Sequence, residues 1–314
     1  MRDFAHPEST LKIDVHQHVW TDPLLEALAA RESLPFVRCC DELTVLHCAD
    51  EQPYVIDVRS EAPARRAALV AADGIDLALI AISSPVGIEG LARESACELI
   101  AAHLEGVAEL GNRFAAWGPI ALDRADPDDV DHLLARGCIG ISLPAAALAG
   151  HDALDLVGPL LERISARRVP LLIHPGPGPG SRGGEAGLCE PLWWRALTGY
   201  VSQMQSAWLS LVSLGRRQHP ELVAVFAMLA GGAPLLSERL HARGGPAIDV
   251  RDPLIYYDTS SYGPAAVEAM ARHVGVRQLV YGSDRPVVEP TPTGHEVLLK
   301  RNGARLLSSI GIPA

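Results

Sequence analysis

The sequence predicts an α/β protein built as a single (β/α)8 barrel, the TIM-barrel fold, with a small insertion after the first strand–helix unit. Short aliphatic and β-branched runs alternate with helix-patterned segments from residue 75 onward, which indicates a parallel sheet. Runs such as residues 76–82 are nearly continuously apolar, as strands buried on both faces are. Eight such runs suffice to close a barrel, and one domain over residues 1–314 matches the roughly 250 residues plus insertions of this fold. A doubly wound open sheet is the alternative.

The elements are placed on this repeat in chain order. The insertion, at about residues 33–60, contains strand-like pieces at Leu43–His47 and Tyr54–Val58, and the loop Pro175–Gly187 is rich in glycine and proline. The helices include Gly90–Leu110, Asp128–Arg136, Asp152–Arg168 and Pro191–Leu214. The eight strands are expected at Leu11–His18, Ile75–Ser83, Phe114–Leu122, Cys138–Leu143, Pro170–His174, Leu222–Leu229, Leu254–Ser260 and Gln278–Ser283.

Composition and charge exclude several classes of partner. The net charge is -11 without a basic stripe, which argues against nucleic acid and anionic membranes and favours a small-molecule partner. The start, Met1–Leu11, lacks the features of a secretory signal, and no apolar run approaches the roughly 18 residues of a membrane span. The expected location is therefore the cytoplasm, where the six cysteines would be reduced thiols.

Polar residues at the ends of three predicted strands form a candidate metal site. His16 and His18 lie two residues apart at the end of the first strand, so both point to the same face. His174 ends the fifth strand and Asp284 follows the eighth. Each residue alone could be a hydrogen-bonded structural residue or a helix cap. Together, three imidazoles and one carboxylate suit a borderline divalent ion such as Zn²⁺, with water in an open position.

At this point the chain resembles the amidohydrolase superfamily, in particular the amidohydrolase 2 branch with its aminocarboxymuconate semialdehyde decarboxylase-like enzymes. The resemblance covers nearly the whole chain and rests on four motifs at residues 14–18, 171–175, 231–234 and 282–286. It implies one metal ion, often zinc, bound by residues matching His16, His18, His174 and Asp284. Binuclear relatives use a carbamylated lysine on strand four, and the only lysines here, Lys12 and Lys300, lie elsewhere.

One position departs from the family pattern. The family usually carries His-x-Gly-Gly after strand six, and its histidine position is Leu229 here. Loss of such a proton-transfer group is commonly worth about 10²–10⁴-fold in rate. Either the reaction needs no base there, as in a ring closure with loss of water, or another residue substitutes for it. The substitutes considered are Asp22, His47, Asp57 and His151.

Substrate contacts are predicted near the ligands and in the insertion. Arg285, next to Asp284, and Arg38 or Arg59 in the insertion could bind a carboxylate or phenolate through paired hydrogen bonds. Trp20, beside the histidine pair, and Trp193, after the glycine-rich loop, could form walls for an aromatic substrate.

The expected function is a metal-dependent hydrolase or decarboxylase that acts on a small aromatic or conjugated substrate. One divalent ion, expected to be Zn²⁺, polarises a carbonyl or carboxylate or activates water, with Asp284 and His174 as catalytic residues. The alternative is a non-hydrolytic cyclase or dehydratase of secondary metabolism, suggested by Leu229. A barrel that only binds a ligand is disfavoured by the intact metal residues, and a homodimer is expected by analogy.

Overall fold

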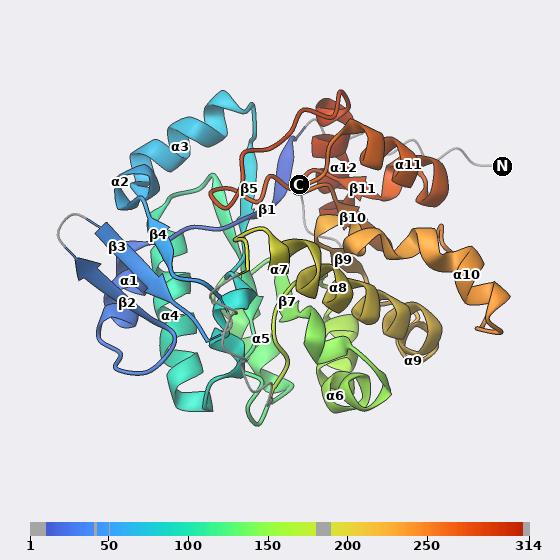
Figure 1. Ribbon diagram of the computed structural model, residues 1–314, viewed down its shortest axis with the longest axis horizontal. Helices are drawn as coiled ribbons and strands as arrows, with labels where there is room; N and C mark the ends of the chain where they lie inside the picture. The colour runs from blue at the N-terminus through green and yellow to red at the C-terminus, as the bar shows by residue number, and fades with distance from the viewer. Residues whose placement is uncertain (1–10, 41–42, 50, 180–189, 310–314) are drawn as a thin grey trace.

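The computed structural model describes residues 11–40, 43–49, 51–179 and 190–309, and within them eight parallel strands form a nearly closed barrel with helices between them (Figure 1). The strands lie side by side in chain order, which confirms the predicted barrel over the open sheet. In that order they are β1 (Ile13–Gln17), β5 (Leu77–Ile80), β6 (Phe114–Pro119), β7 (Gly140–Pro144), β8 (Leu171–His174), β9 (Ala224–Phe226), β10 (Ile255–Asp258) and β11 (Leu279–Val280).

The barrel closes between β11 and β1 through individual backbone hydrogen bonds instead of a continuous ladder. Val15 N donates to Tyr281 O at 2.9 Å, and Asp284 N donates to His16 O at 2.9 Å. The last helix, α12 (Glu296–Ser309), packs at this seam, where Asn302 Nδ2 donates to Leu279 O at 2.8 Å. The helix thus satisfies a carbonyl at the edge of β11.

A bulge in β1 decides which of its side chains face inward. Asp14 pairs with Ala78 and Gln17 with Ile80, so β1 has one more residue than β5 over this stretch. Ile13 and Val15 pack with residues inside the barrel such as Leu172. An extra residue shifts the alternation of side chains, and the histidines after it can then point inward.

Three of the four helices placed from the sequence lie close to their predicted positions: α4 (Arg93–Glu109), α5 (Asp128–Ala135) and α6 (His151–Arg167). The structure also has α1 (Asp22–Ala29), α3 (Pro63–Ala72), α9 (Arg216–Gln218), α10 (Ser237–Ala242) and α11 (Pro264–Val274). The single helix predicted at 191–214 is wrong: α7 (Trp194–Leu197) and α8 (Gly199–Ser210) are separated at Thr198, and a wide turn, Leu211–Gly215, follows. The Thr198 hydroxyl donates to Trp194 O at 2.8 Å, a bond that competes with the helix backbone.

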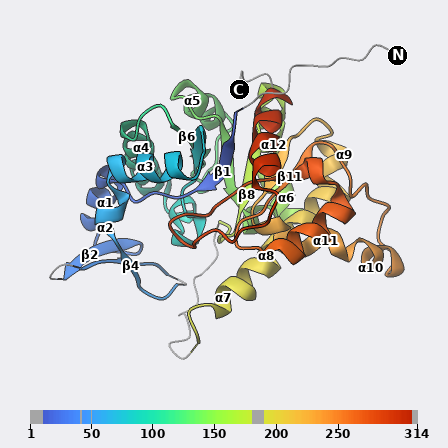
Figure 2. The same cartoon turned by 90° about the horizontal axis from the view of Figure 1, so that it is seen from above.

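The insertion forms a three-stranded antiparallel sheet beside the barrel: β2 (Phe36–Cys40), β3 (Leu43–His47) and β4 (Tyr54–Ile56), followed by α2 (Val58–Glu61). The sequence predicted β3, missed β2 and placed the end of β4 at Val58, which instead begins α2 after the cap Asp57. Figure 2 shows this sheet and α7 projecting from the same side of the barrel. Gln52 Nε2 donates to Glu190 O at 2.7 Å, which joins the insertion to the segment before α7.

Several barrel strands are shorter than predicted because the chain turns early to build the site. The strand expected at 222–229 ends at Phe226, since Met228 to Gly232 adopt positive φ angles. The strand expected at 278–283 ends at Val280, and Asp284 also has a positive φ, 59°.

Two expectations concern residues that the structure describes only in part. The five cysteines within the described residues are all free, whereas Cys189 and the loop from residue 180 to 187 lie outside them. Among the helices of the described residues, none is long and apolar enough to cross a membrane.

Candidate metal centre

The barrel brings His16, His18, His174 and Asp284 together at the carboxyl ends of their strands. One ligand atom from each residue lies within 4.8 Å of the others. The three histidines are buried, while the Asp284 side chain is 15% exposed. The four residues are therefore positioned to share one ion, and Asp284 is the most exposed of them.

The outer nitrogen of each imidazole is held by an oxygen that only accepts hydrogen bonds. His16 Nδ1 lies 2.8 Å from Asp258 Oδ2 and His18 Nδ1 lies 2.8 Å from Ala81 O. His174 Nδ1 lies 2.8 Å from Pro175 O. Each Nδ1 must therefore carry the proton, which leaves the Nε2 lone pairs free to bind a metal.

The inner atoms are spaced as the ligands of one ion would be. His16 Nε2 lies 3.2 Å from His18 Nε2, and Asp284 Oδ1 lies 3.2 Å and 3.7 Å from His18 Nε2 and His16 Nε2. Ligands at the zinc–nitrogen distance of about 2.0–2.1 Å stand about 3.3 Å apart around a tetrahedral ion. Lone pairs this close repel one another without a cation, so the residues fit a divalent metal.

The electrostatics of the cluster show a site built for positive charge. Burial lowers the pKa of His16, but Asp258, Asp284 and Asp14 outweigh it and raise that pKa to about 9. Burial and the neighbouring histidines hold the pKa of His174 well below its usual range. Burial acts to raise the pKa of Asp284, yet the bond to His18 and the histidine charges lower it. A proton on His16 thus supplies the charge that a metal would otherwise bring.

Asp258 supports the first ligand and was missed by the sequence analysis. Its Oδ2 holds His16, and its Oδ1 accepts hydrogen bonds from Met228 N at 3.0 Å and Ser260 N at 2.9 Å. A Cβ at Gly282 would lie 2.8 Å from Asp258 Cγ, so only glycine leaves room for this carboxylate. An acid within the strand predicted at 254–260, on the same face as Tyr256, was the available signal.

A buried polar network that includes Arg66 and Glu61 holds the end of β1 in place. Arg66 Nη2, on α3, donates to His18 O and to Gln17 Oε1, both at 2.8 Å. Its guanidinium also pairs with Glu61 at 3.8 Å, and Glu61 Oε2 accepts from Trp20 N at 2.9 Å. The insertion and α3 therefore hold the backbone on both sides of the second histidine ligand.

The turn at the position of the usual family histidine is strained. Met228, Leu229 and Ala230 have φ angles of 43°, 51° and 53°, a left-handed region that L side chains rarely adopt. Gln205 Nε2 donates to Gly231 O at 2.9 Å, which ties the turn to α8. Leu229 is buried, with 1% of its surface exposed. An apolar side chain thus occupies this position.

The predicted substitutes for that histidine lie elsewhere. His47 stacks on Phe36 with ring centroids 4.8 Å apart, and His151 pairs with Asp155 on the surface. Asp22 is exposed at the start of α1, and the carboxylate of Asp57 caps α2 by accepting from the backbone N of the helix. None of the four is a member of the ligand cluster found among the described residues.

The predicted substrate-binding arginines have other contacts. Arg285 pairs with Asp73 at 3.2 Å and with Glu289 at 2.6 Å, so its charge is already balanced. Arg38 donates to the carbonyls of Val37 and Arg31 at 2.8 Å and 2.7 Å, and its guanidinium lies 4.2 Å from the centre of the Phe36 ring. Arg59 is exposed in α2.

The two predicted aromatic walls differ sharply. Trp193 is 57% exposed and stands beside Trp194, with ring centroids 5.8 Å apart. Trp20 is 5% exposed, and its ring centroid lies 6.5 Å from that of Tyr54. Of the two, only Trp20 is buried, and it lies two residues after the ligand His18.

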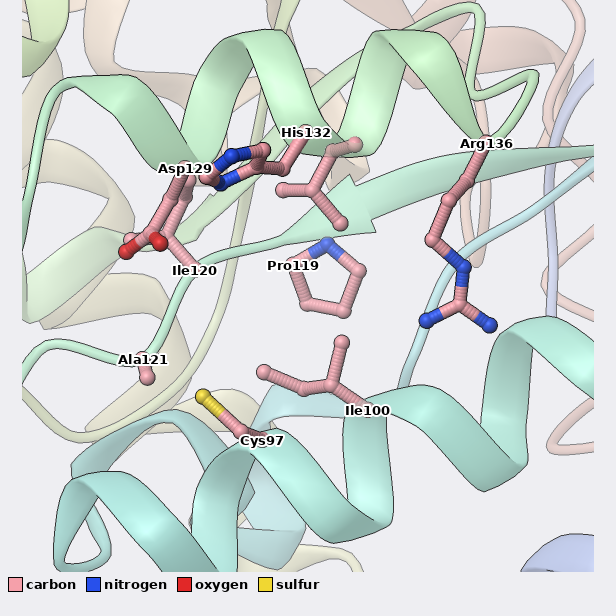
Figure 3. A pocket seen from close by; sticks show the side chains of 9 residues that line it. Cys97, Ile100, Pro119, Ile120, Ala121, Asp129, His132 and Arg136 are labelled. Carbon is pink, nitrogen blue, oxygen red and sulfur yellow. The ribbon is translucent and has the colours of Figure 1, made fainter.

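Two surface hollows lie apart from the metal centre. One, of about 140 Å³, lies between α4 and α5, and Figure 3 shows His132 and Arg136 at its rim. Its Asp129 is already paired with Arg93 at 2.7 Å. The other, of about 460 Å³, runs along α12. Neither is lined by a residue of the metal centre.

Comparison by sequence finds no family model and no curated protein that match the chain. Comparison by structure finds similar barrels over nearly the whole length. Metarhizium anisopliae IDCase has a TM-score of 0.71 at 18% identity, over 97% of this chain and 95% of that one. The 5-carboxyvanillate decarboxylase of Sphingomonas paucimobilis has a TM-score of 0.67 at 18% identity, over 96% and 99%. The Polaromonas dihydroxybenzoic acid decarboxylase, with bound manganese and the inhibitor 2-nitroresorcinol, has 0.64 at 17%, over 96% and 97%. These likenesses show the fold.

Proposed function

We propose that this protein is a metal-dependent enzyme of the amidohydrolase superfamily that decarboxylates a small aromatic carboxylate. The observation that carries the proposal is the convergence of three imidazoles, each anchored through Nδ1, with the carboxylate of Asp284. The decarboxylases that share its fold favour this reaction within the wider class of metal-dependent hydrolases and lyases.

The proposed cofactor is one divalent ion held by His16, His18, His174 and Asp284. When bound, the ion would supply a positive charge that polarises the carboxylate or a neighbouring oxygen of the substrate. Three imidazoles and a carboxylate support zinc. Manganese is the competing ion, because it is bound in the Polaromonas structure.

The protein residues can carry the proton that the reaction needs. Decarboxylation replaces the carboxylate of the ring by a proton and releases CO₂, so it requires no deprotonated water nucleophile. Asp284 is held ionised, and its side chain is 15% exposed, so its carboxylate can accept a proton from a substrate hydroxyl and return it to the ring carbon. We propose His174 as its catalytic partner, which fixes the ion beside that carboxylate.

The identity of Leu229 leaves the proton transfer of this proposal to Asp284. The buried leucine has no group that accepts or donates a proton, so it cannot take this role. No contact in the described residues favours the cyclase alternative, and no neighbour named above is a cyclase. The homodimer, the cytoplasmic location and a place in secondary metabolism remain predictions from the sequence.

The test combines metal analysis with turnover. Protein purified without chelator should contain about one ion per chain and release CO₂ from 2,6-dihydroxybenzoate or 5-carboxyvanillate in the presence of Zn²⁺ or Mn²⁺. A His16→Ala/His174→Ala double variant should lose both the ion and the activity. Wild-type protein that binds no stoichiometric metal under these conditions contradicts the proposal, and elemental analysis of the native protein decides between zinc and manganese.

A further inference from the structure

The inserted sheet brings an aromatic residue to the metal centre that the sequence analysis did not single out. Tyr54 begins β4, where it pairs with Leu46 of β3. Its ring lies 6.5 Å from the ring of Trp20, at an interplanar angle of 37°. Trp20 follows the ligand His18 by two residues, and Glu61, which accepts from Trp20 N, pairs with the Arg66 that donates to His18 O. These contacts join the aromatic pair to the backbone of a metal ligand.

Trp20 presents a buried hydrogen-bond donor without an acceptor. The residue is 5% exposed, and its backbone N is held by Glu61 Oε2 at 2.9 Å. The indole Nε1 has no hydrogen-bond partner within the part of the chain that the structure describes. A buried donor left unpaired is unfavourable, so an oxygen brought by a ligand would gain from meeting it.

Tyr54 adds a second donor that solvent and ligands can reach. It is 39% exposed, and its hydroxyl makes no hydrogen bond to any other described residue. Burial, Glu61 and Asp284 raise its pKa, so the phenol stays protonated and can donate.

We propose that Trp20 and Tyr54 form the substrate-recognition wall of the metal centre, selecting a planar aromatic ring that carries oxygen substituents. The ring packs against the two aromatic faces, while Trp20 Nε1 and the Tyr54 hydroxyl donate hydrogen bonds to its oxygens. This assignment rests on the proposed function, since it specifies the substrate of the same site. It makes the insertion a specificity element.

The test uses equilibrium binding of 2-nitroresorcinol, which has no carboxylate to lose, to the metal-loaded protein by isothermal titration calorimetry. Tyr54→Phe keeps the ring and removes one hydrogen bond, so affinity should fall roughly threefold to tenfold. Tyr54→Ala also removes the aromatic packing surface, so the affinity should fall by roughly a further threefold to tenfold. The control Val55→Ala alters the next residue of β4, 51% exposed, and should stay within about twofold of wild type.

Trp20→Phe tests the indole donor in the same way. It should weaken the binding of 2-nitroresorcinol roughly threefold to tenfold while leaving the metal content, measured by elemental analysis, at the wild-type level. Unchanged affinity in both Tyr54 variants, or no binding by metal-loaded wild type, overturns the wall. Such a result is separate from the proposed function, which fails only if the wild type lacks the metal or releases no CO₂ from the carboxylates.

Discussion

Replacement of Asp258 by asparagine tests a residue that supports the metal ligand His16 while all four ligands stay unchanged. The change keeps the shape of the side chain but removes the charge that faces His16 Nδ1 at 2.8 Å. The asparagine amide has one oxygen and one NH₂ group, and the NH₂ group cannot accept a hydrogen bond. In one orientation it faces Met228 N and Ser260 N, and in the other it faces His16 Nδ1. Carboxylates that orient a histidine ligand typically contribute 10–100-fold to metal affinity, or about 1.4–2.8 kcal/mol.

The assay is competition between the protein and a chelator of known affinity, for Asp258→Asn against wild type at pH 7.5. A matched control is Asp155→Asn, which removes the carboxylate from a histidine–carboxylate pair on the surface, His151–Asp155 at 3.0 Å, that includes no residue of the metal centre. The control should leave metal affinity unchanged. If Asp258→Asn binds metal within twofold of wild type, the anchoring of His16 does not organise the site and the reasoning fails.

Three further predictions concern the surroundings of the ligands. Gly282→Ala puts a Cβ 2.8 Å from Asp258 Cγ, so chelator competition should show weaker metal binding and urea denaturation a loss of about 1–3 kcal/mol; wild-type values for both would contradict it. Arg66→Met leaves Glu61 buried without its partner and should cost about 3–5 kcal/mol in urea denaturation, whereas a loss below about 1 kcal/mol would show that the pair is dispensable. The raised pKa of His16 stabilises the metal-free protein fully below pH 6.5, and this contribution disappears as the pH rises through about 9, so the Tm of metal-free protein should fall across that interval and a flat profile would refute it.

The ligands could be predicted from the sequence because their signals are local. A strand has a period of two, and the end of an apolar run marks the barrel mouth, so His16, His18, His174 and Asp284 follow from one-dimensional patterns. The structure adds the bulge between Asp14 and Gln17, which no composition rule reveals. Without it, the inward position of Val15 would send the histidine next to it outward.

The supporting and substrate contacts could not be predicted because they join residues far apart in the chain. Asp258 meets His16 across 242 positions, and Arg285 meets Asp73 across 212. An arginine beside a metal ligand suits a carboxylate substrate equally well until its partner is known. Tyr54 lay in a segment recognised only as strand-like, and its neighbour Trp20 is brought to it by the packing of the insertion.

The turn after β9 keeps a strained backbone although leucine stands at the position of the usual family histidine. Three residues there that are not glycine have positive φ angles, at a cost of roughly 1–2 kcal/mol each. The same geometry directs Met228 N to Asp258 Oδ1, a bond to a charged acceptor worth about 1.5–3 kcal/mol, and Asp258 in turn fixes His16. The turn therefore retains a role in positioning the first metal ligand. The backbone of the turn keeps this positioning role with a leucine at position 229.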